Sequence, residues 1–211
     1  MKKYLWILAA AFLLQACSKD EEEGPYVPWR PGDDKEETID LDKATKVMIL
    51  TEQAKNRIVM IDQPTGKVAW EWTAADSGLS AAEQAWFDLP DEAKPVYNRT
   101  CVLVTASGGG VALIRIADKK AMFYAKPGGN PHSAEVLPDG NVVVASSTGN
   151  LLSVYVYNGA DSYVSRPAFT MPVHSAHNVV WDRKRGCLWT ATGAQLLDRK
   201  STRLNSSHNN R

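Results

Sequence analysis

The chain has 211 residues, with 24 Lys and Arg against 24 Asp and Glu, so its formal net charge is zero. This balance and the lack of a basic stripe argue against nucleic-acid binding, so no nucleic-acid partner is expected. Nothing in the charge pattern suggests a general anion-binding surface either.

The first residues predict a secretory signal peptide over residues 1–16. Two lysines precede an apolar run from Tyr4 to Leu14, which is too short to span a bilayer. The letters LQAC, which end at Cys17, resemble the lipobox of bacterial lipoproteins. Cys17 is therefore expected to carry lipid and to anchor the chain in a membrane. An ordinary secreted protein with an incidental early cysteine is the alternative.

Residues 17–45 predict an acidic, flexible tether, because they are rich in Pro, Gly, Asp and Glu. The tether starts with Ser18–Glu23, which resembles the acidic leader that some Gram-negative bacteria use to send lipoproteins to the outer face of the outer membrane. A solvated charge run is the alternative. The expected location is thus the outer membrane, through a lipid anchor, with exposure at the cell surface as the further expectation.

Alternating apolar residues and turn signals predict an all-β chain with no convincing helix after the signal peptide. Gly108–Gly110 is expected to form a hairpin turn with positive backbone angles. It is not followed by a helix or by Lys-Ser/Thr, so a phosphate-binding loop is not favoured. The expected strands are residues 47–51, 57–62, 67–72, 101–106, 111–116, 121–125, 133–137, 141–146, 151–157, 178–181 and 187–192.

The strands repeat with a period of about 40 residues. VLVTASGGGVALI, from Val102, returns as VVVASSTGNLLSV from Val142, and HSAEV at His132 returns as HSAHNV at His174. This period, with about four strands per unit, indicates β-propeller blades. We expect an incomplete β-propeller over residues 46–197. It would contain about three and a half blades of a propeller that has about six or seven blades in full. The blades are expected to begin near residues 46, 94, 132 and 176, and a complete small sandwich is the alternative.

Residues 198–211 are expected to be a non-native tail. Back-translation of Asp198–His208 gives a sequence that resembles a common sequencing adapter, and a natural polar tail is the alternative. Within the propeller, Cys101 and Cys187 begin equivalent strands two repeats apart. They are therefore expected to be two separate buried thiols and not a disulfide.

Three stretches carry a resemblance to a known family. They are the run from Glu92 to Asn150, HNVVWDRKRGCLW from His177, and TEQAKNRIVMID from Thr51. Together they resemble a family of β-propeller lipoproteins from Gram-negative gut bacteria, over nearly the whole folded part of the chain. The resemblance implies the fold and the location, and it implies no activity.

The candidate site is the mouth of the propeller channel. His132 follows the loop Pro127–Pro131 and starts an innermost strand, and two further histidines take the matching place in the next blade. Propellers usually bind ligands at such concave mouths. We expect an extracellular carbohydrate or peptide ligand there, contacted by His132, His174, His177, Lys94 and Asn130. A histidine that orders its loop by hydrogen bonds is the alternative for His132.

Spacing argues against a metal site and against a Ser–His nucleophile. His174 and His177 stand three residues apart, so on a strand they point to opposite faces. His132 and Ser133 are neighbours and diverge for the same reason. Glu135 is expected on the same face as Ser133 and opposite His132. No metal and no cofactor are expected.

The run IDQPTGKVAWEW, which starts at Ile61, resembles a quinoprotein repeat. A single good copy argues against a bound quinone. Trp70 and Trp72 share one strand face within this run, and burial between blades is favoured over stacking on sugar rings.

A binding module is therefore favoured over an enzyme. PHSAEVLPDGN, from Pro131, is similar to the histidine-then-DG pattern of arylsulfotransferases, which are propellers too. That resemblance implies sulfuryl transfer through His132, with Lys94 or Arg99 holding the anion. A propeller enzyme of this or the lyase type is the first alternative, and a structural partner in an outer-membrane complex is the second.

Overall fold

The computed structural model of the chain describes residues 36–159 and 162–200. The expected signal peptide, the lipidated Cys17, the acidic leader Ser18–Glu23 and residues 201–211 of the expected tail lie outside the described residues. The folded unit begins at Glu36, inside the stretch expected to be tether. No helix of the described part is long and apolar enough to cross a membrane.

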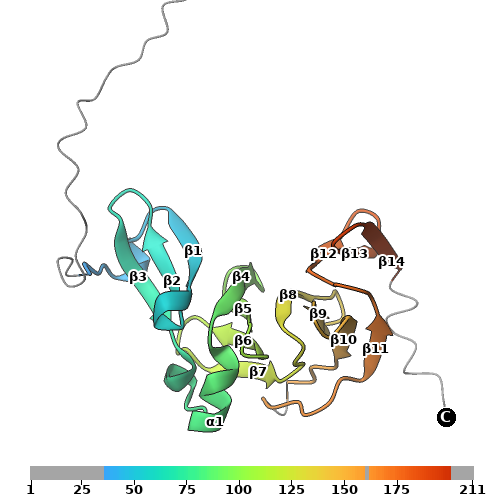
Figure 1. Cartoon of the computed structure of the whole chain (residues 1–211). Coiled ribbons are helices and arrows are strands. Elements are labelled where there is room, and N and C mark those ends of the chain that lie inside the picture. Colours follow the sequence, from blue (N-terminus) through green and yellow to red (C-terminus); the bar gives the residue numbers. More distant parts are fainter. Residues whose placement is uncertain (1–35, 160–161, 201–211) are drawn as a thin grey trace, which may run out of the picture. The chain divides into compact units, whose positions relative to one another are not determined.

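The described residues form four antiparallel sheets, each a simple meander (Figure 1). The first contains β1 (Val47–Glu52), β2 (Arg57–Asp62) and β3 (Lys67–Trp72). The second contains β4 (Pro90–Val96), β5 (Cys101–Ala106), β6 (Val111–Arg115) and β7 (Ala121–Ala125). The third contains β8 (Pro131–Val136), β9 (Val142–Ser146), β10 (Leu151–Tyr155) and β11 (Phe169–Pro172). The fourth contains β12 (Asn178–Asp182), β13 (Cys187–Ala191) and β14 (Leu196–Lys200).

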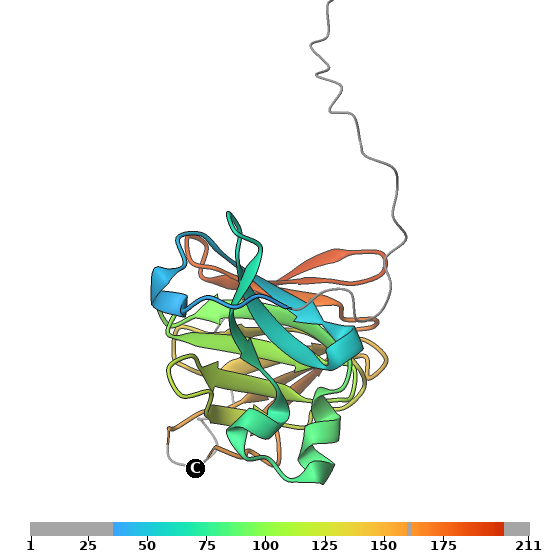
Figure 2. The ribbon, with the colours of Figure 1, turned by 90° about the vertical axis from the view of Figure 1, so that its left-hand side faces the viewer.

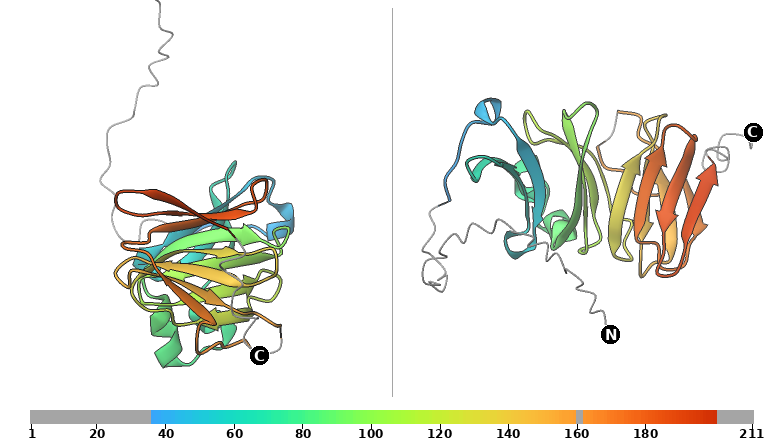
Figure 3. Two further views of the ribbon diagram at one scale, coloured as in Figure 1. Left: turned by 90° about the vertical axis from the view of Figure 1, so that its right-hand side faces the viewer. Right: turned by 90° about the horizontal axis from the view of Figure 1, so that it is seen from above.

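The sheets are successive blades of an incomplete β-propeller. Each meander starts at an edge strand, and these first strands contact one another in chain order: β1 with β4, β4 with β8, and β8 with β12. Figure 3, seen from above, shows the sheets in that order from blue to red. Sheets that follow one another with their first strands side by side are the architecture of a propeller. The expected fold class is confirmed, and the four blades begin at residues 47, 90, 131 and 178.

Three strands were not expected from the sequence. They are β4, which begins at Pro90 and opens the blade expected near residue 94, and the outer strands β11 and β14. β11 is a short outer strand with a proline, and β14 ends in charged residues, so neither shows the apolar alternation of a core strand. Outer strands need only backbone pairing with one neighbour, and β14 pairs with β13 through Lys200, past the expected boundary at Leu197.

The short helices precede or lie within the first blade or join it to the second. They are η1 (Leu41–Lys43), η2 (Gln53–Lys55), η3 (Ala74–Ser77), α1 (Ala81–Gln84) and η4 (Ala85–Phe87). α1 begins with a capping box, in which Ser80 Oγ accepts from Glu83 N over 3.4 Å and Glu83 Oε2 accepts from Ser80 N over 2.9 Å. In Figures 1 and 2 the helices that join the blades are green and lie beside the second sheet.

The glycine run holds these helices against the second blade. Gly109 has φ 105°, as expected for the hairpin turn. Gly110 N donates to the Trp86 carbonyl over 2.8 Å. A Cβ atom on Gly108 would lie 2.5 Å from the Ala85 carbonyl oxygen. The run therefore serves close packing of two backbones as well as the turn.

Three apolar cores lie between the blades. β5 faces the first core with Val102 and Val104 and the second with Cys101 and Leu103. β9 divides its side chains in the same way between the second and the third cores. Both faces of a central blade strand are thus buried, which explains why these strands are apolar at nearly every position.

The expected burial of the two tryptophans and of the two cysteine thiols agrees with this packing. Trp70 and Trp72 are buried in the core between the first two blades, and Trp70 Nε1 donates to the Ile116 carbonyl over 3.0 Å. Cys101 and Cys187 are separate, buried free thiols. Burial between blades, and not sugar stacking, is the role of this tryptophan pair.

Candidate functional site

The first strands of blades two, three and four run in the same direction, side by side. At their starts, Asp91 of β4 lies near His132 of β8, and His132 lies against His177, which precedes β12. At their ends, β4, β8 and β12 border one common cavity. We name the group at the strand starts, Asp91, Asn130, His132 and His177, the His132 cluster.

The His132 cluster joins three blades through an imidazole pair. The rings of His132 and His177 are stacked, with centroids 5.0 Å apart and planes 10° from parallel. His132 Nδ1 lies 3.8 Å from Asp91 Oδ1. The His132 side chain is 30% exposed and that of Asp91 is 13% exposed, so a ligand can reach the imidazoles while the carboxylate is mostly enclosed.

Two β-bulges aim these side chains. Pro90 pairs with Ala106 and Glu92 with Thr105, so Asp91 is the extra residue of β4. In the same way Pro131 pairs with Ser146 and Ser133 with Ala145, so His132 is the extra residue of β8. A bulge re-aims a side chain out of the regular alternation, and it also tolerates proline.

Hydrogen bonds orient the cluster. Asn130 Nδ2 lies 3.0 Å from His132 Nε2 and donates to it when that nitrogen is unprotonated, which directs Nδ1–H of the neutral ring toward Asp91. Ser107 Oγ donates to Asp91 Oδ2 over 2.8 Å and fixes the carboxylate. Asn130 has φ 57°, a left-handed conformation that asparagine tolerates well.

The second imidazole has a defined tautomer as well. His177 Nδ1 lies 2.8 Å from the Ser175 carbonyl oxygen and 3.4 Å from Ser175 Oγ. The shorter contact to an obligate acceptor requires that Nδ1 carries the proton, so His177 cannot accept a proton from Ser175 at this nitrogen. Ser175 is therefore not an activated nucleophile, and Nε2 of neutral His177 is an acceptor for a ligand.

The structure separates the other two expected site residues from the cluster. His174 is exposed and lines a different cavity of about 390 Å³ with Ser175, Thr192–Gln195 and Leu197. Ser175, at φ 53°, turns the chain between the two histidines, so His177 reaches His132 while His174 does not. Lys94 lies farther along β4 and contacts the first strands of the next two blades.

Lys94 satisfies backbone groups at the edges of these strands. Its Nζ donates to Ser133 Oγ over 3.2 Å, to the Ala134 carbonyl over 3.0 Å and to the Val179 carbonyl over 2.8 Å. Nζ also forms ion pairs with Glu92 Oε1 at 3.1 Å and Glu135 Oε2 at 3.9 Å. An edge strand leaves carbonyl and amide groups unpaired, so these contacts fix one blade to the next.

Two glutamates accept from the amides of the next blade. Glu92 Oε2 accepts from Ala134 N over 3.0 Å, and Glu135 Oε2 accepts from Trp181 N over 3.4 Å. Ser133 and Glu135 both approach Lys94 Nζ, as two-residue alternation predicts. Burial raises the pKa of Glu135, an effect larger than the opposing attraction of Lys94.

Asp91 was not among the site residues expected from the sequence. The signal was present, because Pro90-Asp91-Glu92-Ala93 follows the same pattern as Pro131-His132-Ser133-Ala134, with a proline before the bulged residue. Among the described residues, no group of three or more His, Cys, Asp and Glu side chains is placed to hold a metal ion. The side chains of the cluster carry hydrogen-bond donors and acceptors, and Asp91 carries a carboxylate.

Comparison with known protein families shows to which family the chain belongs. Residues 1–201 match the model of a family described as a family of unknown function, DUF6528. The chain belongs to the DUF6528 family. A comparison with curated proteins gave no match.

Solved structures show the same fold for this DUF6528 member. It is similar to hydrazine synthase of Kuenenia stuttgartiensis, with a TM-score of 0.57 and 17% identity over 79% of this chain and 45% of that one. It is also similar to the WD40 β-propeller domain of Doa1, with a TM-score of 0.54 and 13% identity over 77% of this chain and 48% of that one. The chain thus spans about half the length of these solved chains, and at such low identities the likeness concerns the fold alone.

Proposed function

We propose that this DUF6528 protein is a cell-envelope lipoprotein whose β-propeller binds an extracellular carbohydrate or peptide at the His132 cluster. The stacked contact of His132 with His177, made between neighbouring blades beside the Asp91 carboxylate, carries the proposal. Residues from separate blades that meet at the start of the inner strands form a polar site that a single blade could not build.

The chemistry of the cluster favours a neutral ligand rich in hydroxyl groups. Nε2 of the exposed His177 ring can accept a hydrogen bond from a ligand, and the partly exposed His132 ring lies beside it. Asp91 and Asn130 orient His132 from behind. A carbohydrate supplies hydroxyls that both donate and accept, so it is the first candidate. A peptide backbone, which alternates donors and acceptors, is the second.

Binding is favoured over catalysis by the geometry at Ser175 and His177. The proton on His177 Nδ1 is directed to the Ser175 carbonyl, so this pair does not form a nucleophile and its base. Lys94, expected to contact a ligand or to hold a sulfuryl anion, is engaged with backbone carbonyls and two carboxylates. These contacts support a structural role for Lys94 and do not favour sulfuryl transfer.

The test is a glycan and peptide array probed with the full chain, followed by titration calorimetry of the best ligand. His132→Ala should weaken binding by about tenfold or more, because a central contact is removed. His174→Ala is the matched control, since this exposed histidine lies outside the cluster. Equal losses for both variants, or no binding by the wild type, would reject the proposal.

The lipid anchor is tested separately from the ligand. Cys17→Ser should abolish metabolic labelling with palmitate and release the protein from the membrane fraction, because the acylated thiol is removed. Protease treatment of intact cells then distinguishes the two faces of the outer membrane. Unchanged labelling of the Cys17→Ser variant would show that the lipobox interpretation is wrong.

A further inference from the structure

The opposite ends of the inner strands border a second, larger cavity. It has a volume of about 650 Å³ and is lined from three blades, by residues near the ends of β4, β8 and β12. Ligand sites of proteins commonly have volumes of 300–1,000 Å³ and combine apolar walls with a few polar groups. We name this space the Trp181 cavity; its lining includes Tyr97, Asn98, Glu135, Leu137, Trp181 and Arg183.

Two aromatic side chains from different blades line the Trp181 cavity. Tyr97 belongs to the turn after β4 and is 44% exposed, and Trp181 lies on β12 and is partly buried. Tyr97 extends toward the β8–β9 turn of the next blade. A Cβ atom built on Gly140 in that turn would lie 3.8 Å from the Tyr97 hydroxyl oxygen. The exposed ring of Tyr97 and the uncovered part of the Trp181 ring are therefore available to a ligand in the cavity.

The backbone holds Tyr97 in this exposed position. Tyr97, Asn98 and Arg99 have φ values of 49°, 54° and 67°, so three successive residues with side chains are left-handed. Bulky residues rarely adopt this conformation, and such strain tends to concentrate where a side chain must be placed for function. Thr100 secures the turn, since its N and its Oγ1 both donate to the Tyr97 carbonyl, over 3.1 Å and 2.7 Å.

Polar groups complete the cavity. Glu135 supplies a carboxylate near the end of β8, and its side chain is 16% exposed. Asn98 and Arg183 are exposed and supply an amide and a guanidinium group. The cavity thus combines one anionic and one cationic group with an amide and two aromatic rings, which does not favour a ligand of high charge.

We propose that the Trp181 cavity binds a neutral oligosaccharide, at a site distinct from the His132 cluster. A pyranose ring has an apolar face of C–H groups, which fits against an aromatic ring, and a rim of hydroxyls, which can both donate and accept. Tyr97 and Trp181 provide the rings, and Glu135, Asn98 and Arg183 provide acceptors and donors for the hydroxyls. The site is independent of the proposed function, because it lies at the other ends of the same strands.

The experiment titrates the full chain, in mild detergent, with cellotetraose, xylotetraose, mannotetraose and chitotetraose by calorimetry. We expect at least one of the four to bind, and Tyr97→Ala to weaken that binding by about tenfold. Tyr163→Ala is the matched control, because Tyr163 is also 44% exposed and does not line the cavity. Tyr97→Phe keeps the ring and should bind within about threefold of the wild type.

Further variants make each outcome decisive. Arg183→Ala removes an exposed side chain of the cavity and should weaken binding by about fivefold, even where Tyr97→Ala folds poorly. In a His132→Ala background, Tyr97→Ala should still weaken binding by about tenfold, because the two sites are separate. The proposal is overturned if none of the four saccharides binds, or if the losses follow His132 and not Tyr97 and Arg183. It is also overturned if mixed-sequence tripeptides, and no saccharide, bind in a Tyr97-dependent way.

Discussion

The Nζ atom of Lys94 donates a hydrogen bond to the Val179 carbonyl over 2.8 Å, although 85 residues separate them in the chain. Lys94 belongs to the first strand of the second blade and Val179 to that of the fourth. The ammonium group also donates to Ser133 Oγ and the Ala134 carbonyl in the blade between. One side chain thus connects three blades at their inner edges.

Replacing Lys94 should destabilise the whole propeller. Lys94→Met removes three hydrogen bonds and leaves two carboxylates without their cation, so we expect a loss of about 2–4 kcal/mol in the free energy of unfolding. Urea denaturation measures the change. Lys120→Met is the control, because Lys120 is exposed and its replacement should change stability by less than about 0.5 kcal/mol. Equal midpoints for the two variants would contradict the bridging role.

Glu135 should make a contribution to the free energy of unfolding that decreases as the pH rises. Burial raises its pKa above the ordinary value of 4.5, so the folded state binds its proton more tightly than the unfolded state does. The corresponding stabilisation is fully present below the unfolded pKa and is lost as the pH rises through the raised pKa. Between pH 4 and 7, the unfolding free energy of Glu135→Gln should therefore increase relative to that of the wild type as the pH rises. A constant difference would contradict this.

Asp182 should show the opposite dependence. Arg185 donates to its carboxylate over 2.8 Å and is the main cause of a pKa lowered to about 2. Stability from a lowered pKa is present above the ordinary value of 3.8 and is lost as the pH falls through 2. Asp182→Asn should therefore be less stable than the wild type near neutral pH and approach it in strong acid. Thermal unfolding across this range tests the sign.

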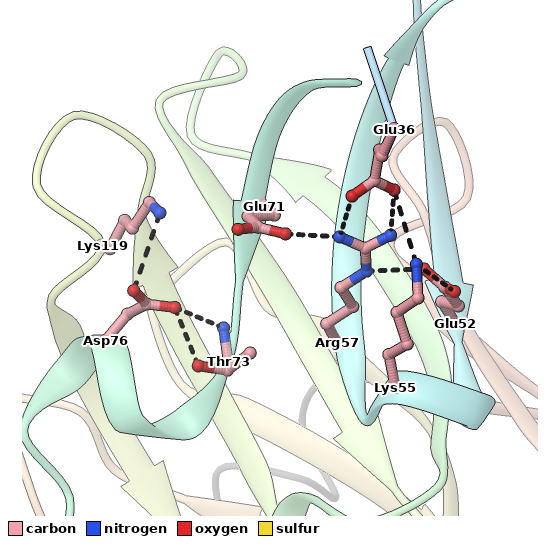
Figure 4. A network of polar contacts seen from close by, with 8 residues as sticks. All are labelled: Glu36, Glu52, Lys55, Arg57, Glu71, Thr73, Asp76 and Lys119. Atoms are coloured by element: carbon pink, nitrogen blue, oxygen red, sulfur yellow. Dashed lines mark hydrogen bonds and ion pairs between the residues drawn. The ribbon is translucent and has the colours of Figure 1, made fainter. Parts of the chain in front are cut away.

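Arg57 should hold the segment that precedes the first blade. Its side chain is 7% exposed and donates to Glu52, Glu71 and Glu36 (Figure 4). The residues that follow Glu36 pair with β3, where Val68 N donates to the Glu37 carbonyl over 2.9 Å. Arg57→Ala should cost about 1–3 kcal/mol and speed proteolysis near residues 36–39.

Glu36→Gln tests the same attachment from the other side. Glu36 is 39% exposed, so solvent screens its ion pair, and we expect a loss of about 0.5 kcal/mol. Proteolysis near residues 36–39 should accelerate less than in Arg57→Ala. Unchanged protection in both variants would show that the β3 pairing alone retains the segment.

Gly108 should resist any side chain. A Cβ atom there would lie 2.5 Å from the Ala85 carbonyl oxygen and 2.8 Å from that of Trp86, both backbone atoms that cannot move without displacing η4. We expect Gly108→Ala to cost about 2 kcal/mol or more. Gly193→Ala is the control, since the nearest atom to its Cβ would be Ser175 Oγ at 3.7 Å. Equal melting temperatures for the two variants would contradict the packing argument.

The apolar pattern along the chain is enough to predict most of the blade strands and their period. Central strands such as β5 and β9 are buried on both faces, so their apolar runs stand out between turn residues and repeat with the blades. It also indicated the buried tryptophan pair, because Trp70 and Trp72 occupy one strand face. These properties depend on nearest neighbours along the chain, and local patterns therefore record them.

Which side chains meet depends on contacts between blades. The two bulges that aim Asp91 and His132 shift the alternation by one residue, and the turn at Ser175 selects His177 over His174. Lys94 was expected at the ligand, but the unpaired edges of β8 and β12 engage it in hydrogen bonds. Outer strands β11 and β14 form by pairing with a neighbour and not by their own apolar pattern. Contacts of this kind join residues from different blades, and a linear pattern carries no register between blades.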